Sequence, residues 1–346
     1  MNTKKVYTIK DIAAEAEVAP STVSRVLGGK STRVKVTEKT REKIFAAARK
    51  LSYCPNVNAQ RLVGSKANTI ALVVPSSMDG AVDVFADYFL RMLLQGLEGM
   101  LIARKYRLMI VFKHETYVAD KEYLRLFSEG SIGGMLIWGA HVSDEYIREL
   151  YDFPVVQVSS YYELSDRVRY IGHDVEQGAF LVTENVLSSG CRRIACVWGA
   201  EYSSIAEEYR HGVLRALKAH GLFPCAEVRG SGFGAMAGER AMESLLQSGR
   251  ETPEAVLFCT TTEAIGGYRV ARRHGMSVPG DIILGGGYGV AADCPWFPTY
   301  VPDSINLGKL AAQRMFAIID GDDTVAQREH IPVVLVPMAA TKTSES

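Results

Sequence analysis

The sequence predicts a small all-α helix-turn-helix unit followed by an α/β domain of two lobes. Two patterns support this: short amphipathic helices fill the first 66 residues, and apolar β-rich runs alternate with helices over the remainder. The length supports it too, since 346 residues exceed the roughly 150 of one domain. We expect boundaries at 1–55 for the helical headpiece, 56–66 for a linker, and 67–346 for the two-lobed domain.

Three helices are expected between residues 8 and 52. Thr8, with an acidic residue three positions later, is a capping-box start for the first helix. Pro20 suits the first position of the second helix, which ends before Gly28-Gly29. Thr37 caps the third. A unit this small buries little apolar surface by itself.

Beyond residue 69 the pattern changes to apolar runs separated by amphipathic helices. Near-continuous apolar strands between helices are typical of parallel sheets covered on both faces. A region of this length exceeds one comfortable sheet, so two lobes are expected. Helices are expected at 83–105 and 204–221, and strands at 70–74, 108–112, 135–138, 155–158, 194–198, 255–259 and 282–284.

Composition excludes several classes of protein. With 47% hydrophobic and 23% charged residues, the chain resembles an ordinary soluble protein. No apolar run approaches the roughly 18 residues of a membrane helix, and the N-terminus lacks the apolar block of a secretion signal. Six cysteines without a C-x-x-C pair suggest neither a zinc site nor a disulfide framework. We therefore expect a cytoplasmic protein without membrane partner, metal or cofactor.

The net charge of zero is an average over two unlike parts. Residues 1–66 hold 14 Lys and Arg against 5 acidic residues, a net charge of +9, so the remaining 280 residues carry −9. The split makes the N-terminal unit a candidate binder of a polyanion, with a solvated basic face as the alternative.

The helices at 9–27, separated by a three-residue break, have the spacing of a helix-turn-helix, whose second helix enters the DNA major groove. Ser21, Thr22, Ser24 and Arg25 are expected on its exposed face. Hydroxyls suit phosphates and base edges, and the Arg suits guanine. Three-helix units also occur in protein-binding modules, but this set of side chains favours DNA.

The segments TIKDIA (8–13), VAPSTVSRVL (18–27), VTEKTREKI (36–44), LSYCPN (51–56) and AQRL (59–62) resemble the headpiece of the LacI/GalR family of bacterial transcription regulators. The resemblance implies a hinge helix from Asn56 to Gly64 that forms on DNA and wedges Leu62 into the minor groove. The alternative for this stretch is a flexible interdomain linker. The DNA-binding residues that the resemblance and the motif imply are Thr8, Pro20, Ser21, Thr22, Ser24, Arg25, Lys30, Arg33, Lys35, Tyr53, Asn56, Ala59, Gln60 and Leu62.

The headpiece departs from the family pattern at three places. Glu17 stands where the family usually has Gly in the turn, and a side chain with positive φ costs free energy there. Ala19 replaces the usual Ser or Thr N-cap. The loop at 28–35 carries three extra residues, whose basic side chains are expected to contact phosphates.

Residues 69–340 resemble the family's effector-binding core, a fold similar to periplasmic sugar-binding proteins. The clearest matches are TIALVVP (69–75), HDVEQG (173–178), GCRRIA (190–195) and GMSVPGD (275–281). Asp174 is a candidate for ligand hydroxyls, and a helix N-cap is its alternative role. The effector-binding residues that the resemblance implies are Ser76, Ser77, Ser159, Ser160, Asp174, Tyr209, Arg210, Thr261, Thr262 and Tyr288. Tyr209 occupies the place of the family's pocket Arg.

Enzyme signatures are weak. The glycine-rich stretches at 230–235 and 285–289 lack the rest of a nucleotide-binding fingerprint, and His141, His173 and His220 are isolated. We expect no catalysis. The predicted function is a sequence-specific regulator, a repressor, that binds a pseudo-palindromic operator as a homodimer and responds to a small molecule, expected to be a carbohydrate. The alternative is a cytosolic small-molecule-binding or sugar-processing protein with an incidental basic N-terminus.

Overall fold

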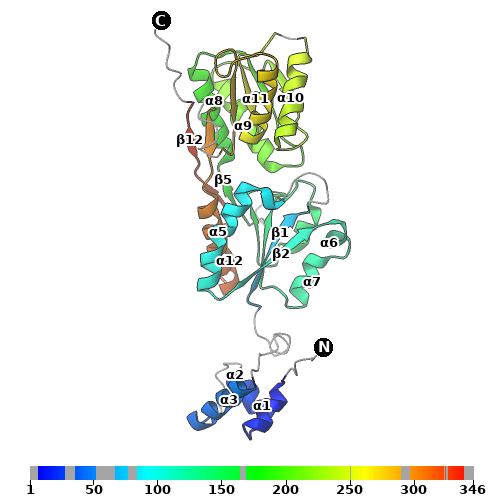
Figure 1. The fold of residues 1–346 in the computed structure, drawn as a ribbon, viewed down its shortest axis with the longest axis vertical. Helices are drawn as coiled ribbons and strands as arrows, with labels where there is room; N and C mark the ends of the chain where they lie inside the picture. Colours follow the sequence, from blue (N-terminus) through cyan, green and yellow to red (C-terminus); the bar gives the residue numbers. More distant parts are fainter. Residues whose placement is uncertain are drawn as a thin grey trace. The chain divides into compact units, whose positions relative to one another are not determined.

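The computed structural model describes residues 7–27, 36–51, 67–76, 84–163, 169–249, 251–289, 297–322, 324 and 326–338. The chain divides into two compact units, Met1–Ala67 and Asn68–Ser346. Figure 1 traces the elements of each unit along the sequence.

The N-terminal unit contains the three expected helices, α1 (Ile9–Glu15), α2 (Pro20–Leu27) and α3 (Glu38–Lys50). Their apolar faces meet around the fully buried side chains of Ile12, Val23 and Ile44. The three helices thus share one small core, which fixes α2 against α1 and α3.

The caps expected from the sequence are present. The Thr8 N–H donates to Asp11 Oδ2 at 2.7 Å at the start of α1. Pro20 is the first residue of α2, as predicted. The Thr40 N–H donates to Thr37 Oγ1 at 3.3 Å at the start of α3. These bonds satisfy N–H groups that a helix start leaves without partners.

The N-terminal lobe of the second unit is a six-stranded parallel sheet in the order β11-β5-β4-β3-β1-β2. Helices α5 (Tyr88–Ala103) and α12 (Ser304–Asp320) pack on one face, and α6 (Glu115–Ala119), α7 (Glu122–Ser128) and the 3-10 helix η3 (Glu145–Leu150) on the other. The strands are β1 (Thr69–Pro75), β2 (Arg107–Lys113), β3 (Gly134–Trp138), β4 (Val155–Val158), β5 (Tyr170–His173) and β11 (Arg328–Ile331).

The C-terminal lobe is a four-stranded parallel sheet in the order β7-β6-β8-β9. Helices α8 (Val175–Ser188) and α9 (Ser204–Ala219) cover one face, and α10 (Ala235–Gln247) and α11 (Thr261–Arg273) cover the other. The antiparallel pair β10 (Thr299–Val301) and β12 (Val334–Val336) adjoins this lobe. The strands of the sheet are β6 (Ile194–Val197), β7 (Ala226–Val228), β8 (Ala255–Phe258) and β9 (Ile283–Gly286).

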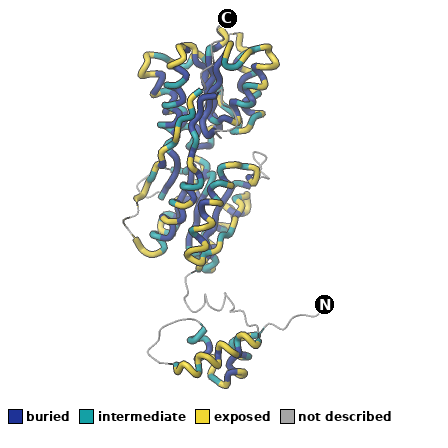
Figure 2. The backbone as a smooth tube through the Cα atoms, turned by 60° about the vertical axis from the view of Figure 1, so that its left-hand side comes forward, coloured by how far each residue is buried: buried dark blue, intermediate teal, exposed yellow. Residues whose placement is uncertain are grey.

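The chain crosses between the lobes after β5, after β10 and after β11. Burial is concentrated in the strands of both sheets, whereas the outward faces of the helices are exposed (Figure 2). The alternation of buried strands and half-exposed helices is the pattern that the sequence predicted.

The structure refines two of the expected helices. The helix expected over 83–105 is divided into the 3-10 helix η2 (Val84–Ala86) and α5, because Asp87 caps α5 by accepting the Leu90 N–H at 2.8 Å. The helix expected over 204–221 ends at Ala219. Strands β7, β10, β11 and β12 were not expected; each has three or four residues, too few to give a periodic signal.

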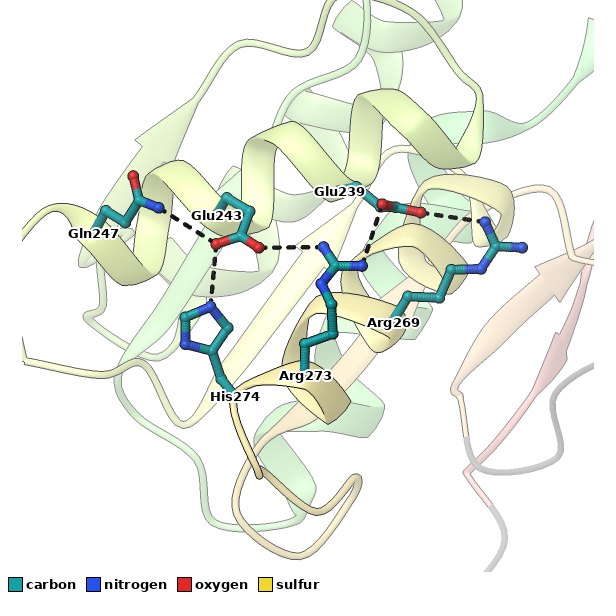
Figure 3. A network of polar contacts seen from close by, with 6 residues as sticks. All are labelled: Glu239, Glu243, Gln247, Arg269, Arg273 and His274. Atoms are coloured by element: carbon teal, nitrogen blue, oxygen red, sulfur yellow. Dashed lines mark hydrogen bonds and ion pairs between the residues drawn. The ribbon is translucent and has the colours of Figure 1, made fainter.

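The outer face of the C-terminal lobe carries an ion-pair network between α10 and α11. Two glycines bring these helices close: an added Cβ at Gly238 would lie 1.9 Å from the Glu263 carbonyl oxygen, and one at Gly266 would lie 1.9 Å from that of Ala235. The carboxylates of α10 therefore reach the basic side chains of α11 and its C-cap (Figure 3). The residues of the network are Glu239, Glu243, Gln247, Arg269, Arg273 and His274. Such exposed pairs contribute little to stability.

The turn before α2 has the conformation that the sequence analysis expected to be costly. Glu17 has φ of 55°, in the left-handed region where a side chain is strained. Replacing Glu17 by Gly should stabilise the N-terminal unit by up to about 1 kcal/mol, because Gly adopts this φ without the Cβ penalty. Slower hydrogen exchange of the α1 and α2 amides in the full chain would measure this stabilisation.

The matched control is Glu17→Ala, which removes the same carboxylate and its 3.9 Å ion pair with Lys43 but keeps the Cβ. Equal exchange rates in the Gly and Ala variants would contradict a backbone origin of the effect.

Candidate functional site

Helix α2 presents a polar face next to its buried one. Ser21 is exposed, and Thr22, Ser24 and Arg25 are partly exposed. Of these four residues, all expected on the exposed face of the helix, only Ser21 is therefore fully exposed. Arg25 lies in the last turn of α2, one helical turn after Ser21 on the same face. The arrangement combines short hydroxyls and a guanidinium along one side of a short helix.

Several of the residues singled out in the sequence lie outside the described residues. They are Lys30, Arg33, Lys35, Tyr53, Asn56, Ala59, Gln60, Leu62 and Ser77.

The carboxyl ends of the two parallel sheets meet at what we call the lobe junction. It comprises Ser159–Tyr161 and His173–Asp174 from the N-terminal lobe, and Trp198–Glu208, Cys259–Glu263 and Gly287–Tyr288 from the C-terminal lobe. The Tyr161 N–H donates to Ser204 Oγ at 3.0 Å across it. A second bond between the lobes runs from the Val142 N–H to the Tyr202 carbonyl oxygen at 2.9 Å.

The backbone is strained on both sides of the lobe junction. Ser159, directly after β4, has φ of 70°, and Tyr288, shortly after β9, has φ of 50°. Neither residue is Gly, so each conformation costs free energy that the surrounding packing must supply. Strain of this kind is concentrated at ligand sites and switch regions.

Buried polar atoms without a hydrogen-bond partner are concentrated at the same junction. Transfer of such a group out of water without a new partner costs free energy, so natural proteins keep few of them. Their concentration indicates a place where a ligand or water completes the bonding. Among the described residues, the atoms at the junction are Ser160 Oγ, both ring nitrogens of His173, Glu208 Oε2, Glu263 Oε1 and the Tyr288 hydroxyl, and those outside it are the hydroxyls of Tyr146, Tyr209, Tyr300 and Ser304.

Glu208, on α9, is one of two carboxyl groups at the junction with strongly raised pKa. Burial is the largest cause and raises the pKa of Glu208 to about 8. The charges of Asp174 and Glu176 act in the same direction, whereas the Tyr161 hydroxyl favours the ionised form by hydrogen bonding. At neutral pH this carboxyl therefore holds its proton most of the time.

Glu263, in the first turn of α11, is the second such group. Its Oε2 accepts from the Thr260 N–H at 3.0 Å and from the Thr260 hydroxyl at 3.1 Å, completing a capping box. The side chain is fully buried, and burial raises the pKa of Glu263 to about 8 despite these bonds. Neither glutamate was among the effector residues expected from the sequence, although the T-x-x-E pattern at 260–263 could have revealed the cap.

His173 sits where the chain first leaves the N-terminal lobe. It is fully buried, and burial lowers the pKa of its imidazole to about 4, with Asp303 opposing the shift. His173 is therefore neutral at physiological pH and adds no positive charge to the junction.

Of the effector residues implied by the resemblance, six lie at the lobe junction: Ser159, Ser160, Asp174, Thr261, Thr262 and Tyr288. Asp174 also acts as the N-cap of α8, its Oδ1 accepting the Gln177 N–H at 3.0 Å. Ser76 is buried at the carboxyl end of β1.

Several of the implied effector residues have visible structural roles. The Tyr209 ring is fully buried in the hydrophobic core of the C-terminal lobe. Arg210 pairs with Glu207 at 2.9 Å. The Thr261 hydroxyl donates to the Gly287 carbonyl oxygen at 3.1 Å, and Thr262 is exposed.

The glycine-rich stretches serve packing. An added Cβ at Gly286 would lie 2.7 Å from the Thr260 carbonyl oxygen, and one at Gly287 would lie 2.8 Å from that of Cys259. An added Cβ at Gly230 would lie 3.1 Å from Glu263 Oε1. Close approach of neighbouring segments thus explains Gly230, Gly286 and Gly287, whereas an added Cβ at Gly232 or Gly234 would meet nothing within 4 Å.

The described residues contain no group of three His, Cys, Asp or Glu placed to hold a metal ion. Within the same residues, no helix is both long and apolar enough to cross a bilayer.

A helix-turn-helix unit joined to a two-lobed α/β domain defines the class of DNA-binding regulators with a ligand-binding domain. Comparison with known proteins agrees: residues 8–56 match the bacterial regulatory proteins of the lacI family, and residues 183–341 match the periplasmic binding protein-like domain. The chain is 30% identical to catabolite control protein A of Priestia megaterium over 287 residues, 80% of each chain. The chain belongs to the LacI family of transcriptional regulators.

Other relatives share the full architecture. The chain is 27% identical to the transcriptional repressor CytR of Escherichia coli K12 over 280 residues, 80% of this chain and 78% of the relative. The solved lac repressor dimer bound to operator has a TM-score of 0.80 at 24% identity, covering 96% of this chain and 98% of the other. The regulator CelR in complex with cellobiose has a TM-score of 0.71 at 24% identity, covering 97% and 100%.

The buried carboxyl of Glu263 should make stability depend on pH. Its folded-state pKa of about 8 lies above the usual 4.5, so the native state keeps a proton that the unfolded state loses, and stability falls as pH rises from about 4.5 to 8. Glu263→Gln keeps the shape without ionising. It should match the wild type near pH 5 and exceed it by about 1–3 kcal/mol near pH 8.5 in denaturant unfolding.

The exposed carboxylate of Glu201 serves as control, since Glu201→Gln should change stability little at either pH. A constant difference between Glu263→Gln and wild type across the pH range would contradict the buried, protonated state of Glu263.

Proposed function

We propose that the protein is a cytoplasmic repressor that binds a pseudo-palindromic operator as a homodimer and releases or tightens its hold when a small polar molecule binds at the lobe junction. The observation that carries this proposal is the pairing, in one chain, of a polar recognition helix with a junction rich in buried, unpartnered polar atoms. Function rests on binding equilibria, without a catalytic step.

DNA recognition is assigned to the N-terminal unit. The net charge of +9 over residues 1–66 supplies phosphate contacts and keeps the acidic remainder of the chain away from DNA. Ser21 and Arg25, on one face of α2, are proposed to reach the major groove. Leu62 is proposed as the minor-groove wedge of a hinge helix that forms only on DNA.

The N-terminal lobe supplies a surface for the homodimer. Strand β2 is at the edge of the six-stranded sheet, with the apolar side chains of Ile110 and Phe112 exposed. The Phe112 ring packs edge-on against Phe85, 5.9 Å between centroids, and extends the apolar surface toward η2. An exposed apolar sheet edge is a hazard to a monomer. A second copy is proposed to cover it.

Effector control follows from linkage between the two sites. A ligand that changes how the lobes meet alters operator affinity by the ratio of its affinities for the two arrangements. The bonds from Tyr161 to Ser204 and from Val142 to Tyr202 are the contacts that such a change makes or breaks. Ser76, Ser77, Ser159, Ser160, Asp174 and Tyr288 are proposed as ligand contacts. One similar protein of known structure holds cellobiose, which supports a polyhydroxylated ligand here.

Operator binding tests the proposal directly. Arg25→Ala should cost about 1–3 kcal/mol on the operator and relax base preference at one position of each half-site, because a guanidinium reads guanine in two bonds. Fluorescence anisotropy with the operator and single-base variants, repeated over a salt series, measures both. Lys50→Ala is the matched control, since Lys50 at the end of α3 is paired with Glu15 of α1.

A uniform loss of affinity on all sequences would make Arg25 a phosphate contact. A salt-independent affinity for DNA in the wild type would refute the DNA-binding role of the basic unit.

The dimer surface is tested by placing a charge on it. Ile110→Asp should turn the dimer into a monomer, because two buried carboxylates would face each other across the sheet edge. Sedimentation velocity measures the change, with Arg107→Asp on the same strand as a control outside the apolar surface. A dimer that persists in the Ile110 variant would place the interface elsewhere.

A further inference from the structure

The carboxyl groups and aromatic rings at the lobe junction favour some classes of polar ligand over others. We infer that the effector carries a positively charged amino group and that the carboxyl of Glu208 receives it. This inference rests on the proposed function, since it concerns the ligand of the same junction.

The first observation is that no basic side chain among the described residues pairs with Glu208. The groups that influence it are Tyr161, Asp174 and Glu176, one hydroxyl and two acids. The nearby guanidiniums have other partners: Arg215 bonds Glu176 and Gln177, and Arg210 bonds Glu207. The carboxyl of Glu208 therefore has no cationic partner among the described residues and is available to a cation from outside the chain.

The second observation is the wall of tyrosines around this carboxyl. Tyr161 packs on Tyr170 with 5.0 Å between ring centroids, and Tyr288 packs on Tyr300 at 5.5 Å. Tyr161, Tyr170, Tyr288 and Tyr300 all lie within electrostatic range of Glu208. Aromatic faces attract organic cations, and the attraction grows when water is excluded. Aromatic rings from both lobes thus lie within electrostatic range of one carboxyl group.

The third observation is independent of charge. The Tyr300 hydroxyl and Ser160 Oγ are more than nine-tenths buried and have no hydrogen-bond partner among the described residues. Each can accept a bond from an ammonium N–H or exchange bonds with ligand hydroxyls. A phosphate or carboxylate ligand would instead meet the charge of Asp174 and the carboxyl of Glu208, which disfavours anionic effectors.

The proton balance of binding follows from these surroundings. Free Glu208 mostly holds a proton at neutral pH, and an ammonium group favours the ionised carboxylate, so binding releases that proton to solvent. For an amine that stays protonated in this range, such as cyclohexylamine, affinity should therefore rise as pH increases from 6 to 8 and level off above it, whereas an amino sugar loses its own proton at about pH 8 and should bind less tightly above that pH. The other charged or titratable groups facing this carboxyl are Tyr161, Tyr170, Asp174, Glu176 and Tyr288, with His173 and Arg328 beyond them; His173 stays neutral in this range.

The test uses matched probes on the full-length protein. The pairs are glucose and glucosamine, galactose and galactosamine, and cyclohexanol and cyclohexylamine, with glucose 6-phosphate as the anionic probe. Thermal shift, at pH 7 for the amino sugars so that their amino groups are protonated and at pH 8 for cyclohexylamine, should show at least one amine that stabilises the protein more than its neutral partner, and calorimetry should then give its affinity. For that amine, Glu208→Gln should weaken binding roughly tenfold or more.

Two further variants make the result decisive. Glu251→Gln removes an exposed carboxylate of the same lobe, outside the lobe junction, and should leave the affinity unchanged. Glu208→Asp retains the charge and should bind more weakly than wild type but more tightly than Glu208→Gln. It also covers the case in which the Gln variant fails to fold.

The inference is overturned by stabilisation from a neutral or anionic probe without any amine response, by an absence of response to every amine, or by wild-type amine affinity in Glu208→Gln. Operator binding by the wild type, measured in parallel, separates these results from a failure of the proposed function, which would abolish specific DNA binding as well.

Discussion

The structure depends on one constraint: two parallel sheets bring their carboxyl ends together, and the loops there must bury polar groups. In a parallel sheet every strand ends at the same edge, so the serines, acids and tyrosines that follow the strands gather at one place. Glu208 and Glu263 remain protonated because this place is dry. The strained backbone at Ser159 and Tyr288 and the unpartnered hydroxyls follow from the same crowding.

The free-energy cost of these unsatisfied polar groups allows a ligand to stabilise one arrangement of the lobes over another. A junction with unsatisfied groups is stabilised by a ligand that satisfies them, so ligand binding and lobe arrangement are linked energetically. Only a few direct bonds, such as that from Tyr161 to Ser204, join the lobes at the strand ends. Three chain crossings hold the lobes together while leaving this edge able to change. A ligand with a few polar groups can thus shift the equilibrium between arrangements of the two lobes.

In the N-terminal unit the core is small, and the conformation is therefore set mainly by local sequence signals. The caps at Thr8 and Thr37 and the proline that opens α2 fix where helices begin. Glu17 shows that the fold tolerates a strained turn when three helices share the core of Ile12, Val23 and Ile44. The small core limits the stability of the N-terminal unit, which agrees with a role that requires only the presentation of one helix.

The sequence by itself determined the helix-turn-helix unit, the two-lobed α/β class and most of the longer elements, because caps and apolar periodicity act over a few residues. It also placed Ser159, Ser160, Asp174 and Tyr288 after strands, where parallel sheets gather polar side chains. Only the tertiary structure decided that Tyr209 is a core residue, that glycines at 286 and 287 serve packing, and that the buried Glu263 and the half-buried Glu208 have no cationic partner among the described residues. Burial and electrostatic environment depend on contacts between residues distant in the sequence, such as Glu208 with Tyr170, and no local pattern encodes them.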